Sequence, residues 1–219
     1  MPVGARLQLP RLYAILDLAN VSTASDPLNE RLTATTNFAQ ELAGGGATLI
    51  QLRGKRVSSR ELLTHARELR RALPPQVRLI LNDRADLCIA AGFDGVHVGQ
   101  EDLSPEAVRA IIGPERILGV STHNLDELRR AAESTADYIA IGPVFATASK
   151  ERPDPLIGLE GVRAARAVLG ERRALVAIGG IGRAEAADVL RAGADSVAVI
   201  SALLAAPRES AAYFQQIML

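Results

Sequence analysis

Three polar side chains that could bind an anion follow directly after an apolar run. The run Thr48-Leu49-Ile50 leads into Gln51-Leu52-Arg53-Gly54-Lys55. Alternate residues of a strand face the same side, so Gln51, Arg53 and Lys55 would share one face. A buried face does not accept an amide and two cations without anionic partners. The segment therefore indicates either a receptor for a phosphorylated ligand or a solvated strand end.

Two carboxylates, Asp83 and Asp102, follow neighbouring apolar segments further along the chain. Proteins usually hold Mg²⁺ through one or two carboxylates, and the ion keeps several of its waters. Each residue also has a structural explanation. Asp83 could cap a helix that begins at Ala85, and Asp102 could be a loop acid or a cap before Ser104. The presence of both carboxylates, with cations opposite, favours a metal site.

Short β-branched segments alternate with longer stretches of helical period along the chain. The expected strands are Leu12–Leu16, Thr48–Leu52, Arg78–Leu81, Gly95–Val98, Ile117–Val120, Tyr138–Ile141, Leu175–Ile178 and Ser196–Ile200. The expected helices are Asn29–Leu42, Ser59–Leu73, Ala85–Ala91, Pro105–Ile112, Leu125–Ser134, Leu159–Leu169, Arg183–Ala192 and Arg208–Met218. Each strand is followed by a helix, which is the pattern of an α/β fold with a parallel sheet.

These units, repeated without a break in composition, predict one closed (β/α)₈ TIM barrel over residues 1–219. Residues 1–10 are expected to be a loose N-terminal extension. A weak repeat supports the count, because four helix ends lead straight into strands through Thr48, Asp94, Asp137 and Asp195. An open doubly wound sheet and a pair of small domains are the alternatives. In the barrel, the polar clusters would collect at one face, where the strands' carboxyl ends open.

Two further segments at that face could bind phosphate. Gly179-Gly180, together with Ser201, follows the last two expected strands, where barrels of this class bind phosphate through backbone N–H groups. A plain tight turn is the alternative, since such turns also need glycine. The long segment Gly142–Lys150 is typical of a binding loop, and Lys150 at its end could neutralise a phosphate or simply be exposed.

The histidines and the cysteine have simpler interpretations. His97 is expected to be a hydrogen-bonded packing residue, whereas His123 lies closer to the expected site and could act as an acid or base. His65 lies in an Arg/Glu-rich helix and is expected to be solvated. Cys88 lies in an apolar segment and is expected in the core.

The overall composition narrows the class of protein. The 219 residues include 25 basic and 25 acidic ones, which leaves no electrostatic footprint for nucleic acid or an anionic membrane. No stretch approaches the length of a membrane span, and the first residues lack the apolar core of a secretory signal. One cysteine excludes an internal disulfide, so we expect a cytoplasmic protein. The composition leaves the oligomeric state open, a homo-oligomer included.

Taken in order, the motifs resemble those of the thiamine-phosphate synthase family. They are Gln51–Lys55, Asn82-Asp83-Arg84, Asp94–Gln100 with Asp102, Gly119–His123, Gly142–Phe145, Ala177–Ile181 and Val199–Ala202. The resemblance implies a transferase of thiamine biosynthesis. Such an enzyme joins 4-amino-2-methyl-5-(diphosphooxymethyl)pyrimidine to 4-methyl-5-(2-phosphooxyethyl)thiazole and releases diphosphate. In this family the diphosphate leaves first, and the thiazole nitrogen captures the pyrimidine cation.

The resemblance also implies roles for individual residues. Contacts to the pyrimidine diphosphate fall to Gln51, Arg53, Lys55, Asn82, Ser121 and Lys150, with Leu52 and Gly54 lining it. Among these, the catalytic set is Arg53, Lys55, Ser121 and Lys150. The implied ligands of Mg²⁺ are Asp83 and Asp102. The implied contacts of the thiazole phosphate are Thr147, Ala148, Ser149, Gly180, Ile200 and Ser201.

The chain departs from the family pattern in two places. The family usually has Thr-Pro-Thr-Lys where this chain has Thr147-Ala148-Ser149-Lys150. Serine keeps the hydroxyl, so binding should survive, while the lost proline loosens the loop. The polar stretch Leu18–Leu28 is longer than the family pattern leads us to expect.

Two rival functions remain at this point. A thiazole tautomerase would share the barrel and the phosphate cradle, would need no diphosphate-binding metal, and would depend on His123. A non-catalytic phosphate-binding barrel would be expected to have lost some of the carboxylates or cations. The presence of Asp83, Asp102 and the complete Gln51–Lys55 segment favours the synthase.

Overall fold

The computed structural model describes residues 6–146 and 155–217. Within these residues, eight parallel strands close into a barrel in sequence order, β1 pairing with both β2 and β8. The strands are β1 (Leu12–Asp17), β2 (Leu49–Arg53), β3 (Arg78–Asn82), β4 (Gly95–Val98), β5 (Ile117–Thr122), β6 (Tyr138–Ile141), β7 (Ala174–Ile178) and β8 (Ser196–Val199). The expected (β/α)₈ barrel is therefore confirmed, and the open sheet is excluded.

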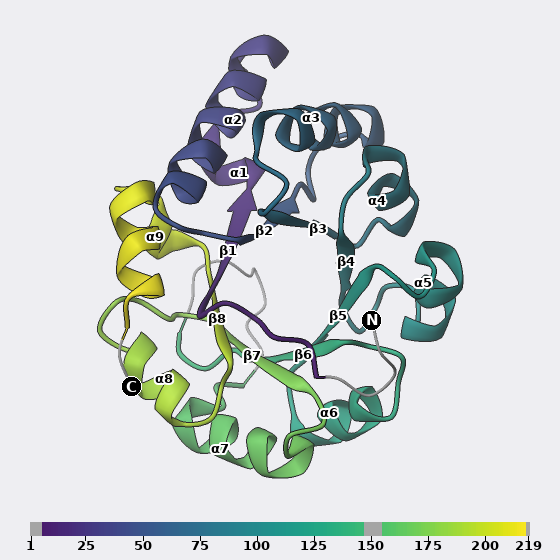
Figure 1. Ribbon diagram of the computed structural model, residues 1–219, viewed down its shortest axis with the longest axis vertical. Coiled ribbons are helices and arrows are strands. Elements are labelled where there is room, and N and C mark those ends of the chain that lie inside the picture. The colour runs from purple at the N-terminus through teal and green to yellow at the C-terminus, as the bar shows by residue number, and fades with distance from the viewer. Residues whose placement is uncertain (1–5, 147–154, 218–219) are drawn as a thin grey trace.

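The helices form a ring around the strands (Figure 1). They are α1 (Leu18–Val21), α2 (Leu28–Gly44), α3 (Ser59–Ala72), α4 (Ala85–Ala91), α5 (Pro105–Ile112), α6 (Leu125–Ala132), α7 (Gly158–Leu169), α8 (Ala186–Arg191) and α9 (Pro207–Gln215), with a 3₁₀ turn η1 (Ser201–Leu203). Helices α4 and α5 match the sequence prediction. Helix α8 is shorter than the expected Arg183–Ala192, and the short α1 and η1 were not expected. Met218 lies outside the described residues.

Local chemistry sets several helix starts. The Ser58 hydroxyl accepts the backbone N–H of Glu61 at 3.2 Å, and the Ser104 hydroxyl accepts that of Ala107 at 3.3 Å. These bonds satisfy N–H groups that the first turn of a helix leaves without a partner. Pro105 follows in the first turn, where its missing N–H costs nothing. Helices α3 and α5 therefore begin where the sequence predicts.

The core consists of two layers separated by the barrel wall. Outward-facing strand residues, such as Leu52 and Leu81, pack against the helices. Inward-facing residues, such as Ile15, Ile80 and Val176, fill the barrel itself. Strand residues alternate between these layers because successive side chains point to opposite faces. The inner layer is the floor on which any site at the barrel mouth must rest.

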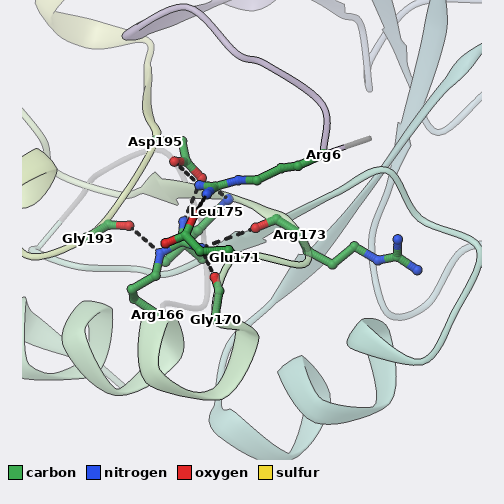
Figure 2. A network of polar contacts seen from close by, with 8 residues as sticks. All are labelled: Arg6, Arg166, Gly170, Glu171, Arg173, Leu175, Gly193 and Asp195. Atoms are coloured by element: carbon green, nitrogen blue, oxygen red, sulfur yellow. Dashed lines mark hydrogen bonds and ion pairs between the residues drawn. The ribbon is translucent and has the colours of Figure 1, made fainter. Parts of the chain in front are cut away.

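The N-terminal segment closes the bottom of the barrel. Leu7 is 5% exposed and belongs to the inner layer, and Leu9 packs against the same cluster. Arg6 forms ion pairs with Glu171 and Asp195 (Figure 2). Residues 6–10 therefore do not behave as the loose extension that we expected, because apolar burial and ion pairs attach them to the barrel.

Three aspartates at the starts of even-numbered strands reinforce this lower face. Each accepts the backbone N–H of a leucine on the preceding strand at 2.7 Å, and each pairs with an arginine from a neighbouring helix. The pairs are Asp94–Arg70, Asp137–Arg109 and Asp195–Arg166, at 3.3, 2.7 and 2.6 Å. These aspartates of the sequence repeat thus connect each of the strands β4, β6 and β8 to the strand before it through a side chain-to-backbone hydrogen bond.

Two side chains on the outer helices test the sequence interpretation further. His65 on α3 is 1% exposed, so the expectation that it is solvated was wrong. Burial lowers the pKa of its imidazole, and Nε2 lies 3.7 Å from a Glu61 carboxylate oxygen. Cys88 is fully buried as expected, and burial raises the pKa of its thiol to about 11.

Among the described helices, none has the length and apolar character needed to cross a bilayer.

Candidate functional site

The carboxyl ends of the strands bring charged residues from different parts of the chain to one face. Asp17 ends β1 and is paired in register with Arg53, which ends β2. Asn82 ends β3 and is paired with His97 of β4. All strands are parallel, so these ends open on the same side, which is where barrels of this class carry their chemistry.

Arg53 is held by a carboxylate. Its guanidinium forms an ion pair with Asp17, whose side chain is 8% exposed. The other Asp17 oxygen accepts the backbone N–H of Ala19 at 3.1 Å and so caps α1. Arg53 therefore has a fixed partner at the mouth and is not a freely solvated strand end.

Lys55 extends beyond β2 toward the carboxylates. Its Nζ lies 3.5 Å from Oδ2 of Asp83, and its side chain is about half exposed. The intervening Gly54 is tightly enclosed, because a Cβ there would lie 2.9 to 3.0 Å from side chains of Val57, Leu18 and Leu62. Glycine at this position lets the segment turn closely past the start of α1. Leu52, expected to line the same ligand, instead faces the helices in the outer layer.

The backbone at Asp83 adopts a conformation that L-residues avoid. Its φ is 62°, and it is the only described residue other than glycine with a positive φ. The N–H of Arg84 donates to the carbonyl of Asn82 at 2.8 Å, so Asp83 is the central residue of a γ-turn. Such strain concentrates at functional sites, where it fixes a side chain in place. The cap of α4 falls on Arg84 without a side-chain bond, so Asp83 is no helix cap.

Asp83 and Asp102 repel one another at close range. Partial burial and the Asp102 carboxylate raise the pKa of Asp83 to about 6, against the opposing effect of Lys55. Asp102 is oriented by the N–H of Gly99, which donates to its Oδ2 at 2.7 Å. Two adjacent carboxylates with this repulsion form a hard oxygen site suited to a divalent cation. Within the described residues no cluster of three or more acidic, His or Cys side chains could hold a metal, so further ligands would be water or substrate.

Below these charges, polar residues form a buried network. Gln51 is 2% exposed and donates through Nε2 to the hydroxyl of Tyr13 at 2.8 Å. His97 contacts the Tyr138 hydroxyl through Nδ1 at 2.8 Å and the Ser121 hydroxyl through Nε2 at 2.7 Å. Burial lowers the pKa of His97 to about 4, so its imidazole is neutral near pH 7. The expected packing role of His97 agrees with these contacts.

The opposite side of the mouth is built from glycines and the loop after β6. Gly179 and Gly180 have φ of 102° and 65°. A Cβ on Gly180 would lie 2.4 Å from the carbonyl oxygen of Ala146, so this turn packs directly beneath the loop. The N–H of Phe145 donates to the Gly179 carbonyl at 2.9 Å. Ile200 packs on the inner layer, and Ser201 opens the 3₁₀ turn η1 beside the end of β8.

The predicted roles of several site residues stay untested by the structure. Thr147, Ala148, Ser149 and Lys150 lie outside the described residues. His123 lies just beyond β5 and contacts Glu127, its Nδ1 being 3.1 Å from a carboxylate oxygen. The structure brings Lys55, Asp83 and Asp102 together, and it places Gln51 and Ser121 at opposite ends of the buried network.

Sequence reasoning missed two tyrosines at this site. Tyr13 and Tyr138 lie within apolar strands, where nothing in the residue types distinguishes them from core residues. A signal was present at Gly119 on β5, where a Cβ would lie 2.0 Å from Cζ of Tyr138. A glycine within a strand often marks the close approach of another group.

The fold and the mouth together define a (β/α)₈-barrel whose carboxyl-terminal face carries basic and acidic side chains close together. Comparison with known proteins identifies the group to which it belongs. A model of the family described as thiamine monophosphate synthase matches residues 21–203. The chain belongs to this family, whose members are transferases.

Individual relatives agree with this assignment. The thiamine-phosphate synthase of Koribacter versatilis is 56% identical to the chain over 99% of both sequences. That of Chloroflexus aurantiacus is 48% identical over 77% of both. Among solved structures, a thiamine phosphate pyrophosphorylase from Pyrococcus furiosus is 31% identical, covers 94% of both chains and superposes with a TM-score of 0.79.

Proposed function

We propose that this chain condenses 4-amino-2-methyl-5-(diphosphooxymethyl)pyrimidine with 4-methyl-5-(2-phosphooxyethyl)thiazole, giving thiamine phosphate and diphosphate. The observation that carries the proposal is the cluster of Lys55, Asp83 and Asp102 at the barrel mouth. This arrangement suits a diphosphate bound together with a divalent cation. Membership of the thiamine monophosphate synthase family supports the same reaction.

The two substrates would occupy the two sides of the mouth. The pyrimidine diphosphate lies over β2, β3 and β5, with Arg53, Lys55 and Ser121 toward its phosphates and Asn82 and Gln51 nearer the ring. Lys150 belongs to the same proposed set. The thiazole phosphate lies over the Gly180 turn, Ile200 and Ser201, with Thr147 to Ser149 above it. The fixed backbone at Gly179-Gly180 supports this second subsite.

The reaction breaks one bond and forms one bond without a net proton transfer. The C–O bond to the diphosphate breaks first, and both electrons leave with the diphosphate oxygen. The lone pair of the thiazole nitrogen then forms the new C–N bond to the pyrimidine methylene carbon. Because the attacking nitrogen carries no proton, no general base is required, which fits a site with a neutral, buried His97.

Charge develops on the leaving diphosphate, so groups that bind it more tightly in the transition state accelerate the step. The Arg53 guanidinium and the Lys55 ammonium supply positive charge, and the Ser121 hydroxyl supplies a donor. Asp17 keeps Arg53 in place while this charge develops. These groups are oriented before the substrate arrives, which reduces the reorganisation that the step requires.

Mg²⁺ is the proposed cofactor, and Asp83 and Asp102 are its proposed protein ligands. When bound, the ion would neutralise charge on the diphosphate oxygens. The fit rests on the donor set, since two hard carboxylate oxygens held together against their own repulsion are stabilised by a divalent cation. The cytoplasmic location remains a prediction from the sequence, and the sequence leaves the oligomeric state open.

A substrate assay tests the proposal. The purified protein is incubated with both substrates, with 5-fold serial dilutions of MgCl₂ after chelation, and diphosphate and thiamine phosphate are measured. We expect equal amounts of both products, formed only when Mg²⁺ is present. Asp83→Asn and Asp102→Asn should each reduce kcat by at least about 100-fold, since each removes a charged ligand from the proposed Mg²⁺ site. Asp86→Asn, an exposed carboxylate on the neighbouring helix, is the matched control and should retain activity.

Two outcomes would contradict the proposal. Release of diphosphate without the thiazole substrate would indicate a hydrolase. Interconversion of thiazole phosphate isomers without the pyrimidine would indicate the tautomerase, and His123→Gln would then abolish activity while Asp83→Asn would not.

A further inference from the structure

A continuous chain of hydrogen bonds crosses the interior of the barrel beneath the mouth. It runs from Gln51 through Tyr13, Tyr138 and His97 to Ser121, and its four bonds measure 2.8, 2.8, 2.8 and 2.7 Å. These five residues come from five different strands, β2, β1, β6, β4 and β5. Both ends of the chain are residues of the proposed diphosphate site, whereas the three middle residues are not.

Burial makes these bonds costly to lose. Tyr13, Tyr138 and His97 are 1%, 0% and 7% exposed, and Gln51 is 2% exposed. A polar group buried at this depth destabilises the fold unless it finds a hydrogen-bond partner. The barrel therefore constrains not only the positions of these atoms but also which of them donates each hydrogen.

The amide end sets the direction of the chain. The amide nitrogen of Gln51 donates and does not accept, so the Tyr13 oxygen accepts from it. The Tyr13 hydrogen then points to the Tyr138 oxygen, because any other direction would leave a buried donor without a partner. By the same reasoning the Tyr138 hydrogen points to Nδ1 of His97.

The imidazole passes this direction on to the serine. A neutral imidazole has one accepting and one donating nitrogen. Since Nδ1 accepts from Tyr138, Nε2 carries the proton and donates to the Ser121 oxygen. The hydrogen of the Ser121 hydroxyl is then not directed at Nε2 and is available to another acceptor.

We propose that this buried chain fixes the Ser121 hydroxyl as a hydrogen-bond donor toward the leaving diphosphate, which makes Tyr13, Tyr138 and His97 positioning residues of the reaction. The inference rests on the proposed function, because the acceptor at the mouth is the diphosphate. The reverse direction would turn the Ser121 hydroxyl inward toward His97 and present only a lone pair to an anion, which is repulsive.

The residues around Tyr138 leave space for its hydroxyl and hold its neighbours in place. Gly119 on β5 leaves space for the phenol, since a Cβ there would lie 2.3 Å from the Tyr138 oxygen. The His97 ring stacks on Tyr138 with centroids 5.5 Å apart and planes at 21°. The Ser121 carbonyl is held by the Gln100 amide at 2.7 Å, so the backbone of the serine is fixed as well. The hydroxyl torsion is the remaining freedom, and the chain removes it.

The protonation pattern of His97 tests the direction without any substrate. The protein has three histidines, so ¹⁵N-histidine labelling gives a spectrum whose signals can be assigned with the His65→Gln and His123→Gln variants. We expect His97 at pH 7.5 to be neutral with the proton on Nε2. In Tyr138→Phe the donor to Nδ1 is absent, and the Nε2–H form should lose its dominance. A proton on Nδ1 in the unmodified protein would overturn the proposal, whatever the enzyme catalyses.

Activity then tests whether the direction matters. We expect Tyr138→Phe and Tyr13→Phe to lower kcat about tenfold, because the donor to a charged oxygen is no longer oriented. The same substitutions in a Ser121→Ala background should change kcat less than about twofold, since the group they position is absent. Tyr213→Phe, whose hydroxyl lies on the exposed α9, is the control and should be unchanged.

Two results in this cycle would contradict the positioning role. Full activity in both single tyrosine variants would show that the serine needs no orientation. Equal losses with and without Ser121 would show that the tyrosines act only through the stability of the barrel. Because Tyr13→Phe and Tyr138→Phe remove single hydroxyls at different points, folding of either variant, checked by its thermal transition, suffices for the comparison.

Discussion

The Arg53 guanidinium forms an ion pair with the Asp17 carboxylate across the adjacent ends of β2 and β1. The two Cα atoms are register partners in the sheet, so the pair is fixed by the same hydrogen bonds that close the barrel. Asp17 is also the cap of α1. This helix begins the polar stretch Leu18–Leu28, which is longer than the family pattern leads us to expect. The carboxylate thus links the proposed diphosphate site to the segment that precedes α2.

This relationship predicts a binding defect in Asp17→Asn. Without its partner, Arg53 gains rotamer freedom that must be lost again when the diphosphate binds, at a cost of up to about 1 kcal/mol. We expect the KM for the pyrimidine diphosphate to rise about 3- to 5-fold, with the KM for the thiazole phosphate unchanged, in steady-state assays. Asp26→Asn, an exposed carboxylate in the same segment, is the control. Tighter binding of the pyrimidine substrate would show instead that Asp17 competes with it for Arg53.

Asp83 provides a prediction about stability and pH. Its pKa is raised from 3.8 to about 6, first by burial and then by the Asp102 carboxylate. Between those pH values the folded state holds more protons than the unfolded state, so the free energy of unfolding falls as the pH rises. Above about pH 6 the ionised carboxylate opposes folding to its full extent.

Asp83→Asn should therefore be more stable than the unmodified protein at pH 8 in the absence of Mg²⁺. We expect a gain of about 1–2 kcal/mol, which disappears below about pH 4, in urea unfolding followed by circular dichroism. Asparagine also tolerates the positive φ of this position. Asp86→Asn is the control with the opposite sign, because Arg84 lowers the pKa of that carboxyl. A destabilised Asp83→Asn would show that the bond to Lys55 outweighs the repulsion.

The sequence was sufficient to predict the barrel because its strands and helices repeat with clear periodicity. Helix starts were placed well where a capping serine precedes the helix, as at Ser58 and Ser104. The misses are the short elements. Four residues in α1 and three in η1 cannot display a helical period, and α8 begins only after a turn in which Glu185 accepts the N–H of Gly182.

The charged part of the candidate site could also be predicted, because strand ends of a parallel barrel share one face. The buried part could not. The bonds that join Tyr13, Tyr138 and His97 depend on the register of β1, β4 and β6 around the closed barrel. A tyrosine in an apolar strand is otherwise indistinguishable from core. Likewise, the γ-turn at Asp83 has no signature in residue type.

One error was avoidable. Leu62, His65, Ala66 and Leu69 occupy positions i, i+3, i+4 and i+7 of α3, and all four are buried. This spacing is that of the buried stripe of an amphipathic helix, and it outweighs the charged composition of the segment as a whole. Composition describes a helix, whereas the stripe decides which of its residues meet the core.

Asp195 leads to a prediction about the lower face of the barrel. It accepts the Leu175 N–H and pairs with both Arg166 and Arg6, as Figure 2 shows, whereas among the described residues Asp94 pairs with one arginine, Arg70. Asp195→Asn leaves two partly buried guanidinium groups without their shared anion. We expect it to lower the free energy of unfolding by about 2–4 kcal/mol in urea titrations, and Asp94→Asn by less.

The matched control for this comparison is Asp188→Asn. That carboxylate lies on α8, is 57% exposed and pairs with Arg191 on the surface. An exposed pair of this kind contributes about 0–1 kcal/mol. Equal effects of Asp195→Asn and Asp188→Asn would mean that Asp195 and its partners contribute no more than an exposed ion pair, and equal effects of Asp195→Asn and Asp94→Asn would mean that the second arginine adds nothing.

Leu7 tests whether the N-terminal segment is an integral part of the fold. Its side chain is 5% exposed and fills the lower end of the inner layer, where truncation leaves a cavity. We expect Leu7→Ala to lower the free energy of unfolding by about 2–3 kcal/mol, and Leu7→Met, which keeps the volume, by less than about 1.5 kcal/mol. Leu103→Ala, at a position 52% exposed, is the control. If Leu7→Ala unfolds at the same urea concentration as the unmodified protein, the barrel is closed from below without residues 6–10.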